Sequence, residues 1–186
     1  TQKEELKKAE TKLKNQTGID AAKAKAAGQP FNQADINSLL DAMRKMSDKE
    51  IESQKAEVLA LKDVAENLNP KQLEFIQTKS DKFTDEEKKK IFDSHFADLE
   101  NIDASVAAVD AGTATPDQKR AVQKLKNLSD KELELLPEEI FNASNISTRE
   151  RAVLKTLSQS QVDAISKNKN VTDKQAIKDE RGRPIN

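Results

Sequence analysis

A short sequence that occurs twice constrains the fold of this chain more than any other feature. Ser47-Asp48-Lys49-Glu50-Ile51 reappears as Ser129-Asp130-Lys131-Glu132-Leu133, at a shift of 82 residues. Both copies are typical of helix starts, because a serine side chain caps free N–H groups of the first turn and acidic residues there complement the helix dipole. A repeated helix start predicts a fold assembled from similar helical units.

The similarity extends to both sides of these two segments. Before them, Ile19-Asp20-Ala21 recurs as Ile102-Asp103-Ala104, and Gly28 corresponds to Gly112. Apolar residues then correspond at a shift of 82: Leu39, Leu40, Met43 and Met46 with Ala121, Val122, Leu125 and Leu128. A further set corresponds at a shift of 89: Val64, Leu68, Gln72, Leu73 and Ile76 with Val153, Leu157, Gln161, Val162 and Ile165. Lysine- and glutamate-rich helices also match by composition alone, but composition does not explain caps, breakers and apolar positions that recur in the same order.

Three similar helix starts mark the ends of the repeats. Thr84-Asp85 resembles both the beginning of the chain and Thr172-Asp173. We therefore predict an all-α fold of two divergent tandem multi-helix units, residues 1–83 and 84–171, forming an elongated helical repeat array. Residues 172–186 are the start of a third unit or a solvated tail. Because the chain begins at a repeat boundary and with Thr1 rather than Met, we expect a segment of a longer protein.

The helices of the second unit follow from its caps and its apolar spacing. One long helix is predicted from about Thr84 to Ala111, since apolar residues recur at intervals of three or four, and Gly112 is expected to end it. Further helices are predicted over 115–127, 129–136, 147–157 and 158–168, with Leu125 buried and a short turn from Pro137 between the second and third. The first unit lacks this proline, so we predict one continuous helix from about Asp48 to Asn67.

Composition narrows the possible core and the possible partners. Charged residues make up 35% of the chain and aromatic residues 3%, so thin two-layer helical packing is expected instead of a thick core. No stretch alternates with the period of a strand, and no apolar run is long enough for a membrane span, so we expect no sheet and no membrane contact from this segment. The 32 basic and 33 acidic residues nearly cancel, which argues against a nucleic-acid partner. The basic tail Lys178–Pro184 contains acids and lacks stacking aromatics, so it is expected to be a solvated end.

Few residues of the sequence are of a type and spacing that indicates catalysis, metal binding or phosphate binding. The single histidine, His95, is expected to be a partly exposed helix residue, because zinc needs three or four ligands and no cysteine or second histidine is present. Gly18, Gly28, Gly112 and Gly182 stand apart, unlike the clustered glycines of a phosphate-binding loop. Glu138-Glu139 follows a proline and is interpreted as complementing a helix dipole. We therefore expect no enzyme, with no catalytic, cofactor-binding or metal-binding residue and no cofactor.

Two segments of the second unit resemble a known class of sequence. Ser129 to Leu136 and Val153 to Lys174 are similar to helical repeats in large uncharacterised proteins of candidate-phyla-radiation bacteria. In that group such repeats often follow membrane segments in proteins that resemble conjugation or type IV secretion components. The resemblance covers roughly a third of each unit and implies a soluble appendage without catalytic residues.

These observations favour a non-catalytic structural or protein-interaction scaffold segment of a longer bacterial protein, associated with secretion or with the cell surface. The alternatives are a structural component of a phage virion and a regulatory subunit whose site is completed by a partner. The expected partners are other protein chains. The absence of cysteine is compatible with the cytosol and with an extracytoplasmic bacterial setting, so the compartment stays open, as do the partner and the oligomeric state.

Overall fold

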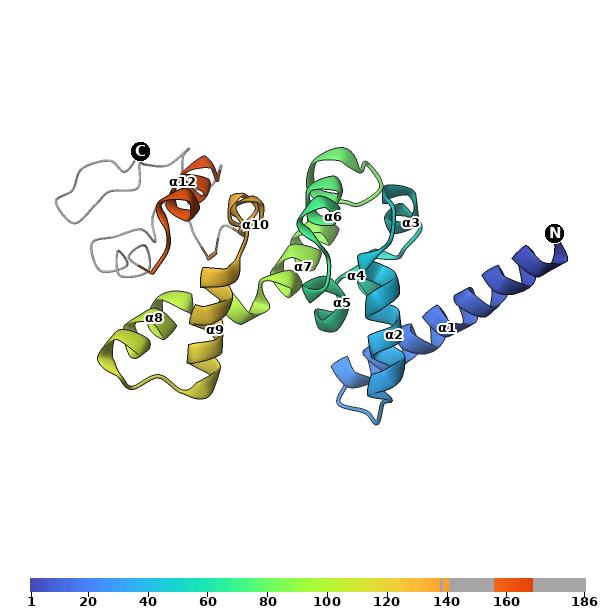
Figure 1. Cartoon of the computed structure of the whole chain (residues 1–186), viewed down its shortest axis with the longest axis horizontal. Coiled ribbons are helices and arrows are strands. Elements are labelled where there is room, and N and C mark those ends of the chain that lie inside the picture. Colours follow the sequence, from blue (N-terminus) through green and yellow to red (C-terminus); the bar gives the residue numbers. More distant parts are fainter. Residues whose placement is uncertain (138, 141–155, 169–186) are drawn as a thin grey trace. The chain divides into compact units, whose positions relative to one another are not determined.

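The computed structural model describes residues 1–137, 139–140 and 156–168. All regular elements within these ranges are helices, and no strand occurs among them (Figure 1). The prediction of an all-α fold is confirmed. The chain divides into two compact units, Thr1–His95 and Phe96–Asn186, and each is described by itself.

A helical hairpin opens the N-terminal unit. Helix α1 (Gln2–Ala26) packs against α2 (Gln33–Arg44). The two helices approach closely at Gly18, where an added Cβ would lie 2.5 Å from the Cβ of Leu39, so no larger residue fits there without movement. At the end of α1, Gly28 adopts a φ of +72° and turns the chain toward α2.

Three short helices follow, where one continuous helix was predicted from Asp48 to Asn67. That prediction is wrong: α3 spans Asp48–Glu52, α4 Ala56–Leu59 and α5 Lys62–Glu66. Ile51 and Val58 are both buried. A continuous helix that buried both would place Gln54 and Lys55, three and four residues after Ile51, on the same inward face. The chain breaks at these polar residues, and the Ser53 hydroxyl donates a hydrogen bond to the Glu50 carbonyl at the end of α3 (2.6 Å).

The N-terminal unit is completed by two further helical segments. Helix α6 (Pro70–Glu74) continues into a π-helical turn, η1 (Phe75–Lys79). Helix α7 (Asp85–His95) then packs against α4 and α5. The largest fully buried side chains of this unit are apolar: Ile36, Leu39, Met43, Ile51, Leu59, Leu73, Ile76 and Ile91.

The C-terminal unit corrects a second prediction, the long helix from about Thr84 to Ala111. Helix α7 ends at His95, a 3-10 turn η2 covers Ala97–Leu99, and α8 spans Ile102–Ala111. The two parts of the predicted helix bury their apolar residues in different places: α7 packs on α4 and α5, whereas η2 and α8 pack on α9 (Pro116–Asn127). The apolar residues of the predicted helix therefore belong to two different cores, and the helix is interrupted between them.

The other predicted helix ends agree with the structure where it describes them. Gly112 adopts a φ of +74° at the end of α8, and Thr115 and Ser129 cap α9 and α10 (Asp130–Glu134). Ser158 caps α12 (Gln159–Lys167), and Leu125 is fully buried. In the predicted turn, the N–H of Ile140 donates to the Pro137 carbonyl (3.1 Å). The predicted helix start at 147 and the third start at 172 lie outside the described residues.

The boundary between the compact units differs from the predicted boundary between repeats. A new repeat was predicted to begin at residue 84, but the compact units divide after His95. The reason is that α7, which was predicted to open the second repeat, packs on α4 and α5.

Candidate functional site

His95 does not form the partly exposed helix position that the sequence predicted. The residue is 3% exposed, and its Nδ1 lies 2.5 Å from the carbonyl oxygen of Ala65 in α5. The imidazole therefore contributes to the packing of α7 against α5. A burial of this kind could have been anticipated from its position beside Phe92, which is also buried.

Within the described part of the chain, the other residues that the sequence singled out are not brought together into a site. Gly18 lies beneath Leu39, and Gly28 and Gly112 form helix-ending turns. Glu139 is exposed, whereas Glu138 and Gly182 lie outside the described residues. Among the described residues, no group of three or more histidines or carboxylates could hold a metal ion.

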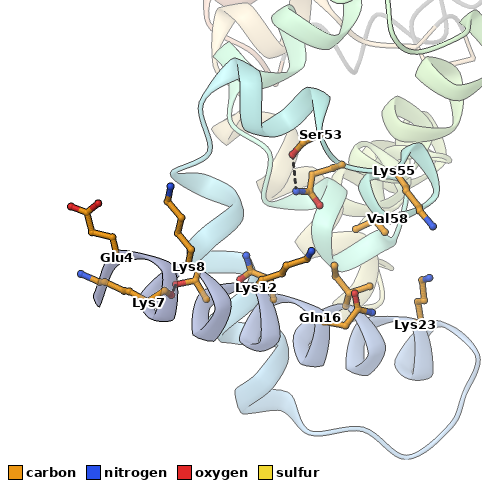
Figure 2. A pocket seen from close by; sticks show the side chains of 13 residues that line it. Glu4, Lys7, Lys8, Lys12, Gln16, Lys23, Ser53, Lys55 and Val58 are labelled. Atoms are coloured by element: carbon orange, nitrogen blue, oxygen red, sulfur yellow. Dashed lines mark hydrogen bonds between the residues drawn. The ribbon is translucent and has the colours of Figure 1, made fainter. Parts of the chain in front are cut away.

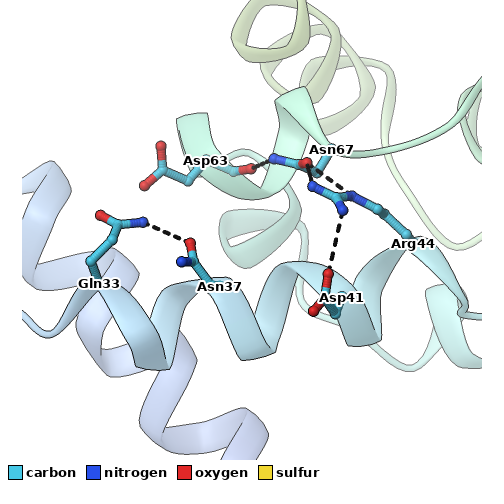
Figure 3. A network of polar contacts seen from close by, with 6 residues as sticks. All are labelled: Gln33, Asn37, Asp41, Arg44, Asp63 and Asn67. Atoms are coloured by element: carbon cyan, nitrogen blue, oxygen red, sulfur yellow. Dashed lines mark hydrogen bonds and ion pairs between the residues drawn. The ribbon is translucent and has the colours of Figure 1, made fainter.

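A polar network joins the end of α2 to α5 (Figure 3). Arg44 donates from Nε to the Asn67 side-chain oxygen (3.0 Å) and from Nη1 to Asp41 (3.3 Å). Asn67 in turn donates from Nδ2 to the Asp63 carbonyl (2.8 Å). The Asp63 carboxylate pairs with Lys25 of α1 (3.2 Å). The Arg44–Asn67 bond joins α2 to the end of α5, and the Lys25–Asp63 pair joins α1 to α5, so the network has a structural role.

A cleft open to a partner lies between α1 and the Ser53–Val58 segment, which contains the break between α3 and α4. Its volume is about 910 Å3, within the range of binding pockets for small ligands and short segments. Figure 2 shows side chains of α1 pointing toward this segment across the opening. We call this feature the lysine cleft, because five lysines line it against one acidic residue, Glu4: Lys7, Lys8, Lys12, Lys23 and Lys55.

Most of this positive charge is not neutralised within the described part of the chain. Lys23 pairs with Glu57 at 3.5 Å. The remaining four lysines of the cleft form no ion pair there, and Glu4 is 3.8 Å from the N-terminal amine. Exposed lysines that face one opening raise the local positive potential and attract anionic groups.

The wall of the lysine cleft combines this charge with apolar and amide groups. Val58 is 4% exposed and Ile19 is partly buried, and both line the cleft. Asn15 and Gln54 contribute amides that donate and accept hydrogen bonds. The cleft therefore offers contacts for carboxylates, for peptide groups and for an apolar side chain.

Sequence reasoning missed this cleft for an identifiable reason. Lys8, Lys12, Ile19 and Lys23 follow one another at helical spacing along α1, and this spacing is visible in the sequence. The opposite wall, however, exists because the chain breaks around Ser53–Lys55, where a continuous helix was predicted. Without that break the lysines belong to an ordinary solvated helix face.

Two further findings concern membrane-spanning helices and similarity to known proteins. No helix in the described ranges combines the length and the apolar character needed to cross a bilayer. No family model matches the chain, and neither a curated protein nor a solved structure shows significant similarity to it.

Proposed function

We propose that the chain is a non-catalytic scaffold, built from two divergent tandem helical units in an elongated array, whose surface binds other protein chains. Its placement in a longer bacterial protein associated with secretion or the cell surface is part of the same proposal. That placement rests on the resemblance of residues 129–136 and 153–174 to repeats of candidate-phyla-radiation bacteria.

The observation that supports the tandem arrangement best is a tertiary hydrogen bond made in both units. In the N-terminal unit, Nε2 of Gln72 donates to the carbonyls of Met43 (2.7 Å) and Met46 (3.2 Å) at the end of α2. In the C-terminal unit, Nε2 of Gln161 donates to the carbonyls of Lys126 (2.9 Å) and Leu128 (3.2 Å) at the end of α9. Gln72 and Gln161 are also the capping-box residues of α6 and α12. The acceptors Met46 and Leu128 correspond at the shift of 82 residues, and helical composition alone does not predict this long-range contact in both units.

The ends of the helices add support. Gly28 and Gly112 have φ angles of +72° and +74°. After each glycine, a backbone N–H donates to the carbonyl five residues earlier, from Gln29 (2.8 Å) and from Thr113 (2.9 Å). This is the pattern of a Schellman turn, in which glycine removes the steric cost of a left-handed residue.

A scaffold needs a surface that its own fold leaves open, and the lysine cleft is such a surface. Its lysines project from α1, whose other residues near Gly18 are held by α2. A partner would therefore bind to a charged face of a helix that α2 holds in place before binding. This arrangement supports binding of proteins more directly than it supports a reaction, because the one histidine is buried in packing.

The proposal is tested by two measurements on the full chain. The first is a thermal-shift screen with nucleotides, coenzymes, sugars and divalent metals, for which we expect no stabilisation. The second is chemical crosslinking in cells of the source organism followed by mass spectrometry, for which we expect crosslinks between this chain and a stoichiometric protein partner.

Either measurement can overturn the proposal. A small molecule at about 100 times its dissociation constant adds about 2.7 kcal/mol of stability, and such a shift would favour an enzyme or a regulatory subunit. Crosslinks confined to this chain, with none to another protein, would contradict the proposed scaffold function.

A further inference from the structure

The same helical face is used differently in α1 and in α7. At the shift of 83 residues that aligns Thr1 with Thr84, Lys8 corresponds to Ile91 and Lys12 to His95. Ile91 is fully buried and His95 is 3% exposed, because α7 packs through this face on α4 and α5. Lys8 and Lys12 are exposed and line the lysine cleft. The face that closes a core in α7 is open and basic in α1.

The lysines on this face repel one another in the free protein. Lys8 and Lys12 are four residues apart on α1, a spacing at which like charges destabilise a helix. Lys55 faces the same opening from the other wall (Figure 2). An anionic partner relieves this repulsion when it binds, and it gains attraction from several lysines at once.

The rest of the lining distinguishes between anionic partners. Among the described residues that line the lysine cleft none is aromatic, and these residues offer no stacking surface of the kind on which single-stranded nucleic acids are bound. Ile19 and Val58 instead provide an apolar contact, and the amides of Asn15 and Gln54 match peptide groups. These features fit an acidic polypeptide that presents at least one apolar side chain.

We propose that the lysine cleft binds an acidic segment of a partner protein, with its carboxylates on Lys8, Lys12 and Lys55 and an apolar side chain against Ile19 and Val58. This inference rests on the proposed scaffold function and names the chemistry of its partner. Affinity for such a segment falls as salt rises, because the exposed ion pairs are screened.

The test uses the full chain and a fluorescein-labelled peptide of three Glu-Leu-Asp-Glu repeats, with binding followed by fluorescence anisotropy at low salt. The variant Lys8→Glu/Lys12→Glu reverses two charges inside the cleft. The matched control Lys3→Glu/Lys14→Glu makes the same change in net charge on α1, at exposed lysines that do not line the cleft. Circular dichroism of each variant verifies that the helices are retained.

We expect the cleft variant to lose at least about tenfold in affinity and the control variant to change by less than about twofold. Bound peptide should also protect Lys8 and Lys12 from acetylation, measured by mass spectrometry. Equal losses in both variants, or no binding to the unchanged chain at about 1 mM peptide, would overturn the proposal.

Two other outcomes would identify a different occupant. Tighter binding of a single-stranded oligonucleotide than of the acidic peptide would assign the cleft to nucleic acid. Self-association in sedimentation that the cleft variant abolishes and the control retains would assign it to a second copy. Loss of peptide binding alone leaves the scaffold proposal standing if crosslinks to a partner map to another surface, so the two failures are distinguishable.

Discussion

Helices α1 and α7 begin with the same kind of cap but differ in what surrounds them. Thr1 accepts a hydrogen bond from the N–H of Glu4 (3.4 Å), and Thr84 accepts one from the N–H of Glu87 (3.1 Å). After that, α1 continues for 25 residues, whereas α7 ends after 11. The first 14 residues of α1 are exposed, while α7 buries Ile91 against its neighbours.

The comparison separates a feature of a helix that does not depend on its packing, the cap, from one that does, the length. A cap is satisfied within one turn, so it persists whether or not the helix meets another element. The length of the helix depends on tertiary packing, because α7 ends where the chain enters a second core. In α1 no second core intervenes, and Leu6 and Leu13 stay 62% and 70% exposed.

The largest expected effect compares corresponding positions of the two helices. Ile91→Ala removes a fully buried side chain from α7 and should destabilise the protein by about 2–5 kcal/mol, through lost burial and a cavity. Lys8→Ala at the corresponding position of α1 should change stability by less than about 0.5 kcal/mol, because Lys8 is exposed. Urea unfolding followed by circular dichroism measures both. Similar costs at the two positions would contradict the contrast between the packed and the open face.

A smaller difference is expected between Gln72 and Gln161, each of which links two helices within its own unit. Gln72 is 3% exposed, and Gln72→Ala removes its bonds to the carbonyls at the end of α2 and to the N–H of Asn69, at a cost of about 1–3 kcal/mol. Gln161 is only partly buried, so water can replace its bonds, and Gln161→Ala should cost about 0.5–1.5 kcal/mol.

Native-state hydrogen exchange measures how each of these two variants changes local stability in each unit. The Gln72→Ala change should accelerate exchange in α2 and α6, and the Gln161→Ala change in α9 and α12. If either substitution leaves the exchange of its own unit unchanged, the hydrogen bond does not hold that unit together.

The sequence predicted the features of this fold that are encoded locally. The starts of α3 and α10 follow from Ser47 and Ser129, which form capping boxes with Glu50 and Glu132. These contacts span three residues, so their pattern is visible in a single segment. The helical character of the described residues also follows from apolar spacing.

The features that the sequence did not reveal depend on contacts between distant residues. The break between α3 and α4 has no proline or glycine, and it places Gln54 and Lys55 outside the core. The lysine cleft depends on that break, because Lys55 forms its second wall. The polar partner of the buried His95 is a carbonyl thirty positions away, in Ala65. Local periodicity does not specify such contacts.

The smallest expected difference between the two halves of the chain concerns Gly28 and Gly112, whose substitution should cost nearly the same stability. Gly28 and Gly112 have nearly the same φ angles, +72° and +74°, and an added Cβ at either position meets no atom within 4 Å. The cost of Gly28→Ala and of Gly112→Ala therefore comes from the left-handed backbone alone, about 1 kcal/mol each. Urea unfolding of the two variants measures both costs.

Agreement between the two glycine variants would sharpen the comparison of the halves, because it isolates a helix end from the packing that differs around it. Gly18→Ala serves as the control, since its Cβ would come within 2.8 Å of the Asp35 carbonyl oxygen and should cost more than either. A difference above about 1 kcal/mol between Gly28→Ala and Gly112→Ala would mean that the two turns are not equivalent. The matching turns would then lose their value as support for tandem units.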